Sequence, residues 1–282
     1  MIISSQNDLL ISDLFKGDLQ LASPPTVYFQ LQEVIKNPNK TVVDAAFVIE
    51  KDAGLSIRLL KIVNSAFYGF PAEISSIDRA INLIGTKELQ NITLATIVID
   101  KFSGFPSDLV SMGDFWSRNL RCALIAQGID RQLGKQFSES IFICGILHHI
   151  GQLVCFQKLP ELAKEVLLML QSTDDSTTAD EIRLENNIIG FDHFAVGAAL
   201  TELWKLPQDI TDSIRLHPYP DSIDNNFKIA SIVRVADSYS KFDGFCDENQ
   251  ASQLNISATD ISMIIDKAYD QFEEVFKIFY PG

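Results

Sequence analysis

The sequence predicts an all-α protein, and three observations carry this prediction. Apolar residues recur every three or four positions along almost the whole chain, while the strict apolar–polar alternation of half-buried strands is nearly absent. Helix-start signals of the form Ser/Thr-x-x-Asp begin at Thr41, Ser75 and Ser257. Glycines stand where the periodic stretches should end, at Gly85, Gly134 and Gly190.

The first compact block runs from about residue 19 to residue 102 and opens on Pro24-Pro25. Its connections are tight, and residues 104–113 read as a loop. Apolar periodicity between these turn signals predicts helices at about 26–36, 41–52, 55–67, 76–84 and 86–101.

The second block begins at Asp114 and is followed by a polar stretch at 242–255. Residues 172–178 are predicted to form a solvated loop inside it. A last amphipathic helix at 257–280 either packs back on the protein or forms a homodimer. Within the block, periodicity predicts helices at about 114–133, 138–150, 160–171, 179–189, 193–204, 207–216 and 226–241.

Composition narrows the class of protein and its partners. The 282 residues, 46% of them hydrophobic, suffice for one large domain or two small ones with a packed core. Lys and Arg total 23 against 37 Asp and Glu, so the formal net charge is −14. Such a surface repels nucleic-acid phosphates and anionic membranes, so we expect neither as a partner.

Targeting signals and cysteines point to the cytoplasm. Residues 1–10 lack the basic start of a signal peptide, and the apolar runs are shorter than the roughly 20 residues that a membrane helix needs. No two of the four cysteines form a Cys-x-x-Cys pair, and three lie in apolar stretches. We therefore expect reduced thiols at Cys122, Cys144, Cys155 and Cys246.

All four histidines fall within one hundred-residue span, and two of them, His148 and His149, are adjacent in an apolar stretch. On a continuous helix His148 shares its stripe with Gly145 and Gly151, which leaves room beside the imidazole. Neighbouring residues on a helix point about 100° apart. We therefore expect one of the pair to face a central site and the other to make a lateral contact.

Asp237 shares a helical stripe with Ala230 and Val233, so its carboxylate is expected inside, where it must pair or bind a cation. Alone, such a carboxylate is usually a structural ion pair. His193 follows Asp192 at a helix start, where the helix dipole favours the neutral imidazole, and His217 precedes Pro218. Each histidine alone fits an ordinary cap or loop residue, but together they form a metal-site candidate of His148, His149, His193, His217 and Asp237.

A series of motifs resembles the HDOD family over about residues 17–240. The stretches that carry the resemblance are 64–69 (NSAFYG), 74–85 (ISSIDRAINLIG), Phe115-Trp116, 145–151 (GILHHIG), 190–193 (GFDH), 196–198 (VGA), Trp204 with Leu206-Pro207, and 235–237 (VAD). The resemblance implies an HD-domain-like multi-helix bundle. It divides into an N-terminal helical part at about 17–103 and an HD-like part at about 114–240, followed by a C-terminal extension at 241–282.

HD-superfamily proteins, which this family resembles, hold one or two divalent cations through an early His, a His-Asp pair and a late Asp. This sequence departs from that pattern at two positions: Arg118 stands where the early His is expected, and His149 replaces the Asp of the pair. His148 and Asp237 keep their expected types. We predict that Arg118 forms a bidentate ion pair with Asp237 in place of the metal.

Three functions compete. The first is a bacterial signal-transduction module that binds a signalling protein or a small ligand, with no catalytic residue assigned. The second is an atypical metal-dependent phosphohydrolase or phosphodiesterase that uses the histidine cluster with Zn, Ni or Fe. The third, nucleic-acid binding, rests on a superficial helix-Gly-helix resemblance at 77–93. It is disfavoured because residues 86–91 carry a single base and one acid.

Overall fold

The structure is a computed structural model that describes residues 9–281, except 19–20, 22, 104–108, 135–138, 173–176, 220–227, 242–251 and 253. Every regular element in the described residues is a helix, and none of them is a strand, which confirms the all-α prediction. Cys246 lies outside the described residues, whereas Cys122, Cys144 and Cys155 are buried free thiols, as predicted.

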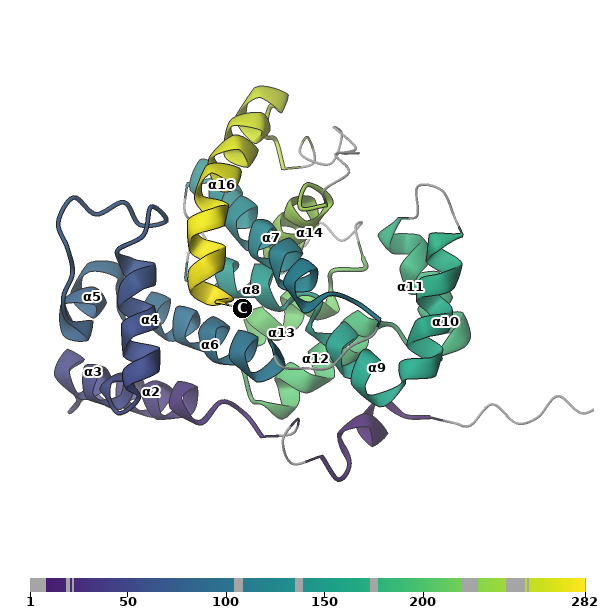
Figure 1. Cartoon of the computed structure of the whole chain (residues 1–282), viewed down its shortest axis with the longest axis horizontal. Helices are drawn as coiled ribbons and strands as arrows, with labels where there is room; N and C mark the ends of the chain where they lie inside the picture. The colour runs from purple at the N-terminus through teal and green to yellow at the C-terminus, as the bar shows by residue number, and fades with distance from the viewer. Residues whose placement is uncertain are drawn as a thin grey trace, which may run out of the picture.

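The N-terminal helices gather at one end of the molecule in Figure 1. A short 3₁₀ helix that the sequence did not predict, η1, precedes them at Ile11–Phe15. Helices α3 and α5 pack together, α2 packs on α3 and α6, and α4 contacts α3, α5 and α6. The helices are α2 (Thr26–Lys36), α3 (Val42–Glu50), α4 (Ala53–Val63), α5 (Ile77–Ile84) and α6 (Thr86–Ser103).

The remaining helices surround α7 (Met112–Gln132), which packs against α8, α14 and α16. Helices α10 and α11 form an antiparallel pair on the side away from the N-terminal helices (Figure 1). The elements are α8 (Ile141–Leu147), α9 (Ile150–Lys158), α10 (Pro160–Gln171), α11 (Thr178–Ile188), α12 (His193–Leu203), α13 (Gln208–Arg215), α14 (Lys228–Ser238) and α16 (Ala258–Phe279).

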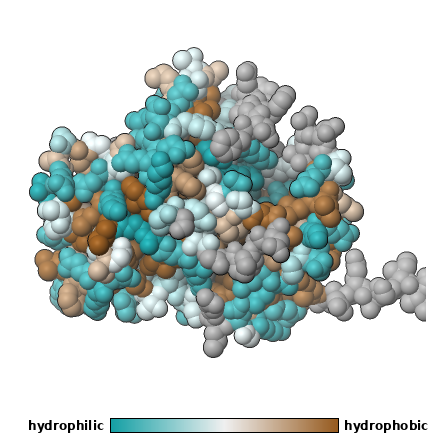
Figure 2. Space-filling view, viewed as in Figure 1, coloured by the Kyte–Doolittle hydropathy of each residue, from teal (hydrophilic) through white to brown (hydrophobic). Residues whose placement is uncertain are grey.

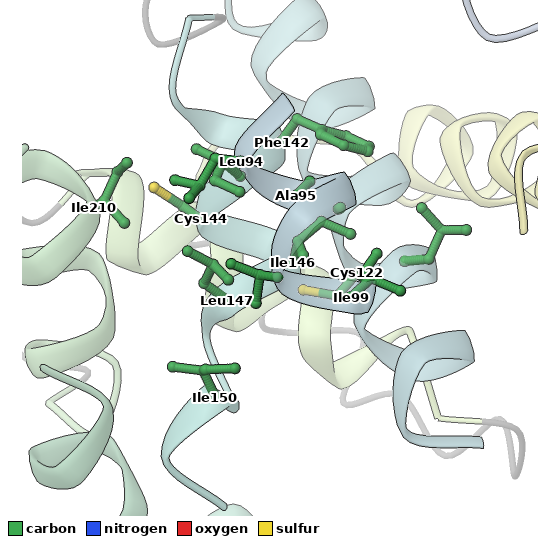
Figure 3. Close-up of a cluster of buried hydrophobic side chains, with 14 of the residues drawn as sticks. Leu94, Ala95, Ile99, Cys122, Phe142, Cys144, Ile146, Leu147, Ile150 and Ile210 are labelled. Carbon is green, nitrogen blue, oxygen red and sulfur yellow. The ribbon is translucent and has the colours of Figure 1, made fainter. Parts of the chain in front are cut away.

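One apolar core runs through both groups of helices. Figure 3 shows its centre, where α8 side chains such as Phe142 and Ile146 lie among residues of α6, α7, α9 and α13. Residues 141–158 are long and apolar enough to cross a membrane, but 89% of that stretch is buried inside the protein. It is therefore the core of the fold, and α6 joins the N-terminal helices to it through α8.

Two predicted helices end earlier than the sequence indicates. Helix α4 stops at Val63 rather than 67, because the Asn64 side chain bonds to Leu60 O and to both backbone groups of Ile74. The helix predicted at 138–150 stops at Leu147, and α9, which the sequence analysis missed, begins at Ile150. His149, with φ −98° and ψ 12°, leaves the helical conformation without any Gly or Pro to signal the break.

Helix ends otherwise follow the predicted signals. Thr41 and Ser257 cap α3 and α16 through the backbone N–H groups of Asp44 and Asp260. The predicted start at Ser75 is wrong by one residue, because Ser76 is the N-cap of α5. The three helix-ending glycines all have positive φ, a conformation that costs glycine no steric strain: Gly85, Gly134 and Gly190.

Gly145 and Gly151 bring helices together rather than leaving room beside His148. A Cβ on Gly145 would lie 2.5 Å from the Cα of Ala123 on α7. A Cβ on Gly151 would overlap the carbonyl oxygen of His193 and lie 2.6 Å from the nitrogen of Gly197 on α12. The two glycines therefore hold α7 and α12 against the segment that carries His148 and His149.

Helix α16 packs back on its own chain, as one of the two predicted alternatives requires. It lies across α7 and reaches α4 and the turn that follows it, where Gln271 donates to Ala66 O and Glu274 accepts from Ala66 N. The Phe279 ring meets Phe142 in the core, with ring centroids 5.8 Å apart. A homodimer stays a prediction, as do the domain limits at residues 17 and 240.

We predict that Gly151→Ala lowers the free energy of unfolding by about 3 kcal/mol or more, because the added methyl must force α9 and α12 apart. Gly54→Ala is the matched control: its Cβ would meet only the Asp52 side chain at 3.4 Å. It should change stability by about 1 kcal/mol at most. Urea denaturation of the unaltered protein and the two variants tests this. Equal denaturation midpoints for Gly151→Ala and Gly54→Ala would contradict the close packing of α9 and α12 at Gly151.

Candidate functional site

Arg118 and Asp237 form a bidentate ion pair between α7 and α14. Nε of Arg118 donates to Oδ1 of Asp237 at 3.0 Å, and Nη2 donates to Oδ2 at 2.9 Å. Burial opposes ionisation of the Asp237 carboxyl, but the Arg118 guanidinium, together with His149 and His148, holds the pKa of Asp237 well below its usual range. The predicted pairing of Arg118 with Asp237 is confirmed.

Three of the four histidines surround Asp237 and His193 contacts one of them, His149, so the structure brings the predicted residues together. Nε2 of His148 and Nε2 of His149 lie 3.2 and 3.5 Å from Oδ1, and Nε2 of His217 lies 4.0 Å from Oδ2. The prediction that only one of the adjacent pair faces the site is wrong. The helix break at His148–His149 turns both rings toward Asp237, with their centroids 4.0 Å apart.

Backbone and hydroxyl groups hold the carboxylate and His148 in place. Nδ1 of His148 lies 2.7 Å from Gly145 O, so Nδ1 carries the proton in this bond. The Ser240 hydroxyl lies 3.1 Å from Oδ1 of Asp237, and Nε of Arg121 donates to Ser240 O at 2.9 Å. Arg118 and Arg121, one turn apart on α7, thus both secure the end of α14.

A second carboxylate, Glu185 on α11, completes the site, and the sequence analysis missed it. Its oxygens lie 2.8 and 2.9 Å from Nδ1 of His193 and accept from the His193 backbone N–H at 2.9 Å. Nε2 of His193 lies 2.9 Å from Nδ1 of His149. The four groups therefore form a buried row from Glu185 through His193 and His149 to Asp237. A Glu eight residues before a buried His was its only sequence signal.

The hydrogen bonds along this row indicate which of its imidazoles carries a charge. Burial disfavours the imidazolium of His193, but the surrounding carboxylates, Glu185 above all, together raise the His193 pKa, contrary to the neutral form expected at a helix start. Burial and the neighbouring His148 and Arg118 charges lower the pKa of His149 well below its usual value. Protonated His193 donates to Glu185 and to Nδ1 of His149, which places the His149 proton on Nε2, facing Asp237.

This arrangement balances every buried charge in the row. Arg118 compensates Asp237, and protonated His193 compensates Glu185, while His149 stays neutral. His217 is held apart from the row and stacks on Phe194, with ring centroids 4.5 Å apart. Burial, then the charge of His148, lowers the pKa of His217 well below its usual value, so it too is neutral.

The residues do not fit the divalent cation that the resemblance implies. Both oxygens of Asp237 already accept from Arg118, and Nε2 of His148 and Nε2 of His149 lie 3.2 and 3.5 Å from Oδ1 of the same carboxylate. A dication about 5 Å from the guanidinium would be repelled by roughly 7 kcal/mol at an effective dielectric constant of about 20. The row has no uncompensated negative charge to offset that repulsion.

Two clusters of metal-ligating side chains occur among the described residues, and neither changes this conclusion. Cys122 lies with His148 and Asp237, but its thiol donates to Val233 O, and burial raises its pKa well above the usual value. Glu181 and Glu185 form the second cluster with His193. The Glu185 carboxylate already accepts hydrogen bonds from Nδ1 and from the backbone N–H of His193.

A cavity of about 450 Å³ opens beside the ion pair and is the right size for a small molecule. The buried residues Asn119, His149 and Gln152, with the three-quarters-buried Arg118, form its inner part. The rest of its lining is Val110, Ser111, Asp114, Phe115, Phe156, Leu167, Leu170, Thr177, Glu181 and Lys241. Sequence reasoning missed the cavity, because α7, α9, α10 and α11 form it together.

Comparison with known proteins yields one family match. A family model described as the HDOD domain matches residues 21–220. An uncharacterized protein of Treponema pallidum (strain Nichols) is 28% identical over 198 residues, which cover 68% of this chain. The match spans about a third, 36%, of that longer protein.

Two solved structures share the fold. A candidate phosphohydrolase of Shewanella amazonensis SB2B superposes with a TM-score of 0.71 at 24% identity, covering 93% of this chain and 99% of the other. A protein of Marinobacter aquaeolei VT8 named for signal transduction gives a TM-score of 0.69 at 17% identity, covering 91% of this chain and 58% of the other. At these identities the likeness concerns the fold alone.

We predict that breaking the ion pair destabilises the protein more than breaking a surface pair. Arg118→Met should cost about 3 kcal/mol, because it leaves the Asp237 charge buried and unpaired. Asp237→Asn should cost about 2 kcal/mol, because Arg118 is 24% exposed and water screens it partly. Arg183→Met, which removes an exposed pair with Asp180, should cost less than about 0.5 kcal/mol.

Urea denaturation of both single variants and the double variant measures the coupling between Arg118 and Asp237. The double variant should lose about 1–3 kcal/mol less stability than the two single variants lose in total. Additive costs would show that the two side chains do not interact.

We predict that His217 makes stability fall at acid pH. Because its pKa in the folded protein lies well below the ordinary value of 6.5, the unfolded chain binds a proton below that pH and the folded chain does not. Stability therefore falls with pH below about 6.5, by up to about 1.4 kcal/mol per pH unit for this group. In His217→Phe, which preserves the stacked shape, this part of the slope should vanish. If the stability of His217→Phe and that of the unaltered protein fell in parallel between pH 7 and pH 5, His217 would not be the group that titrates.

Proposed function

The chain belongs to the HDOD family, and we propose that it is a signal-transduction module of that family that works by binding and does not hydrolyse phosphoesters. The bidentate bond of Arg118 to Asp237 carries the proposal. A hydrolytic metal centre needs about three protein ligands and an open position. In this site a guanidinium takes both oxygens of the carboxylate that would otherwise serve as a ligand.

Two features of the protein support a binding role. The cavity beside Arg118 has the volume of a small-ligand site. Val43 and Phe47 on α3 and Ile57 on α4 are 56–68% exposed. Figure 2 shows hydrophobic residues reaching the surface over the N-terminal helices. Exposed apolar groups on neighbouring helices suit contact with a protein partner. We place this module in the bacterial cytoplasm, acting on a signalling protein, a small ligand or both.

An atypical phosphohydrolase or phosphodiesterase is the second candidate, and one observation favours it. Nε2 of His148 and Nε2 of His149 are buried near Asp237 without a hydrogen-bond partner among the described residues. Zn, Ni or Fe would suit imidazole ligands. Binding would require Arg118 to leave Asp237, which the charge balance of the site opposes.

We predict that the protein, purified without a chelator or an affinity tag, contains no stoichiometric Zn, Ni, Fe or Mn by elemental analysis. It should release no p-nitrophenol from bis(p-nitrophenyl) phosphate when any of these ions is added. The double variant Arg118→His, His149→Asp restores the superfamily ligand types and should bind one or more equivalents of metal. Stoichiometric metal with hydrolysis in the unaltered protein would refute the proposed function.

A further inference from the structure

Helices α10 and α11 are joined to the rest of the protein by few buried apolar side chains. Their buried residues are Ala163 and Val166 on α10 and a single carboxylate, Glu185, on α11. By contrast, α12, which is as long as α11, buries most of its residues. The pair lies at the edge of the molecule in Figure 1, where α10 packs on α9 and α11 packs mainly on α10. Segments with so few buried apolar contacts separate from a protein at a lower free-energy cost than its core does.

Both ends of the pair are marked by non-helical residues. Leu159, with φ −134° and ψ 49°, separates α9 from α10, and Gly190, with φ 99°, follows α11. Gly190 adopts this conformation without steric strain. Hinges of moving elements are a few residues of this kind at element ends, where a change in φ and ψ moves a whole segment. Rotation about Leu159 and Gly190 would therefore swing α10 and α11 together.

The helix ends far from these hinges form one wall of the cavity beside Arg118. Leu167 and Leu170 near the end of α10, and Thr177 before the start of α11, line the cavity. Helices α7 and α9 supply its other lining residues Arg118 and His149. A swing of α10 and α11 would therefore widen the cavity and leave the ion pair of Arg118 in place.

Two carboxylates of α11 hold the pair in its present position. Glu181 accepts from Nε2 of Gln152 on α9 at 2.6 Å. Glu185 lies 2.8 Å from Nδ1 of His193 on α12 and accepts from the His193 backbone N–H at 2.9 Å. Hydrogen bonds to a charged group are stronger than those between neutral groups. These contacts therefore offset the small apolar contact of the pair with the core.

We propose that α10 and α11 form a hinged lid, which opens about Leu159 and Gly190 and admits a small ligand to the cavity beside Arg118. Glu181 and Glu185 keep the lid closed. Entry of a ligand rests on the proposed binding function, whereas opening is a property of the ligand-free protein and can be measured without a ligand.

The described cysteines report opening of the lid. Cys155 on α9 lines a narrow gap beneath the lid with Ala163 and Val166, whereas Cys122 and Cys144 lie in the central core (Figure 3). The folded full chain is labelled with N-ethylmaleimide, and its peptides are mapped by mass spectrometry. Cys155 should react at least tenfold faster than Cys122 and Cys144. Equal rates at all three would show that only global unfolding exposes Cys155, and would overturn the proposal.

Amide hydrogen exchange distinguishes a swinging lid from local unfolding. Rotation about Leu159 and Gly190 preserves the hydrogen bonds within both helices. The free energy of opening measured at the Cys155 thiol should therefore be lower than that measured at the amides of α10 and α11. Equal values would mean that the helices unfold to expose Cys155, which refutes the lid.

Two matched variants test what keeps the lid closed. Glu185→Gln keeps an oxygen for His193 and removes only the charge, so the labelling rate of Cys155 should rise about tenfold. Glu165→Gln removes an exposed carboxylate from α10 and should leave that rate unchanged. Burial, then the charge of Glu185, raises the pKa of the Cys155 thiol. The rates are therefore compared at saturating reagent, where labelling follows the rate of opening alone.

The core thiols separate opening from a loss of global stability in Glu185→Gln. If Cys122 and Cys144 accelerated as much as Cys155, or if the Cys155 rate did not change, the proposal would be wrong. All these measurements use the ligand-free protein. The lid can thus be refuted while the metal and hydrolysis measurements still uphold the proposed function.

Discussion

The ion pair between Arg118 and Asp237 fixes the arrangement of the whole site. It joins α7, the helix around which α8, α14 and α16 pack, to the end of α14. Once the guanidinium neutralises Asp237, the surrounding imidazoles no longer face a free anion, and His149 and His217 remain neutral inside the core. A charge-balanced row stands where the resemblance to the HD superfamily implies a cation and its ligands.

Buried charge of this kind is costly, and its geometry compensates for that cost. Two parallel hydrogen bonds between a guanidinium and a carboxylate, with Ser240 at the same oxygen, satisfy Asp237 without metal. A second buried carboxylate, Glu185, is paired with His193 in a similar way. The close approaches at Gly145 and Gly151 hold the segment between these pairs, so the site is rigid because the helices that carry it are tightly packed.

The fold could be predicted from the sequence because apolar periodicity and helix caps are local signals. The pairing of Arg118 with Asp237 could be predicted too, since their positions within motifs brought opposite charges together. The break at His148–His149 could not, because no Gly or Pro marks it and the core around α8 decides it. Glu185 and the cavity were missed for the same reason: contacts between helices distant in sequence create them.

A high-resolution crystal structure of the protein grown with Zn²⁺ and Ni²⁺, with anomalous diffraction recorded at both absorption edges, would show whether a metal can displace Arg118 from Asp237. We expect both Asp237 oxygens to stay within hydrogen-bond distance of Arg118, and no anomalous peak among His148, His149, His217 and Asp237. An anomalous peak bound to Asp237, with Arg118 turned away from it, would contradict the central claim that the guanidinium has replaced the metal.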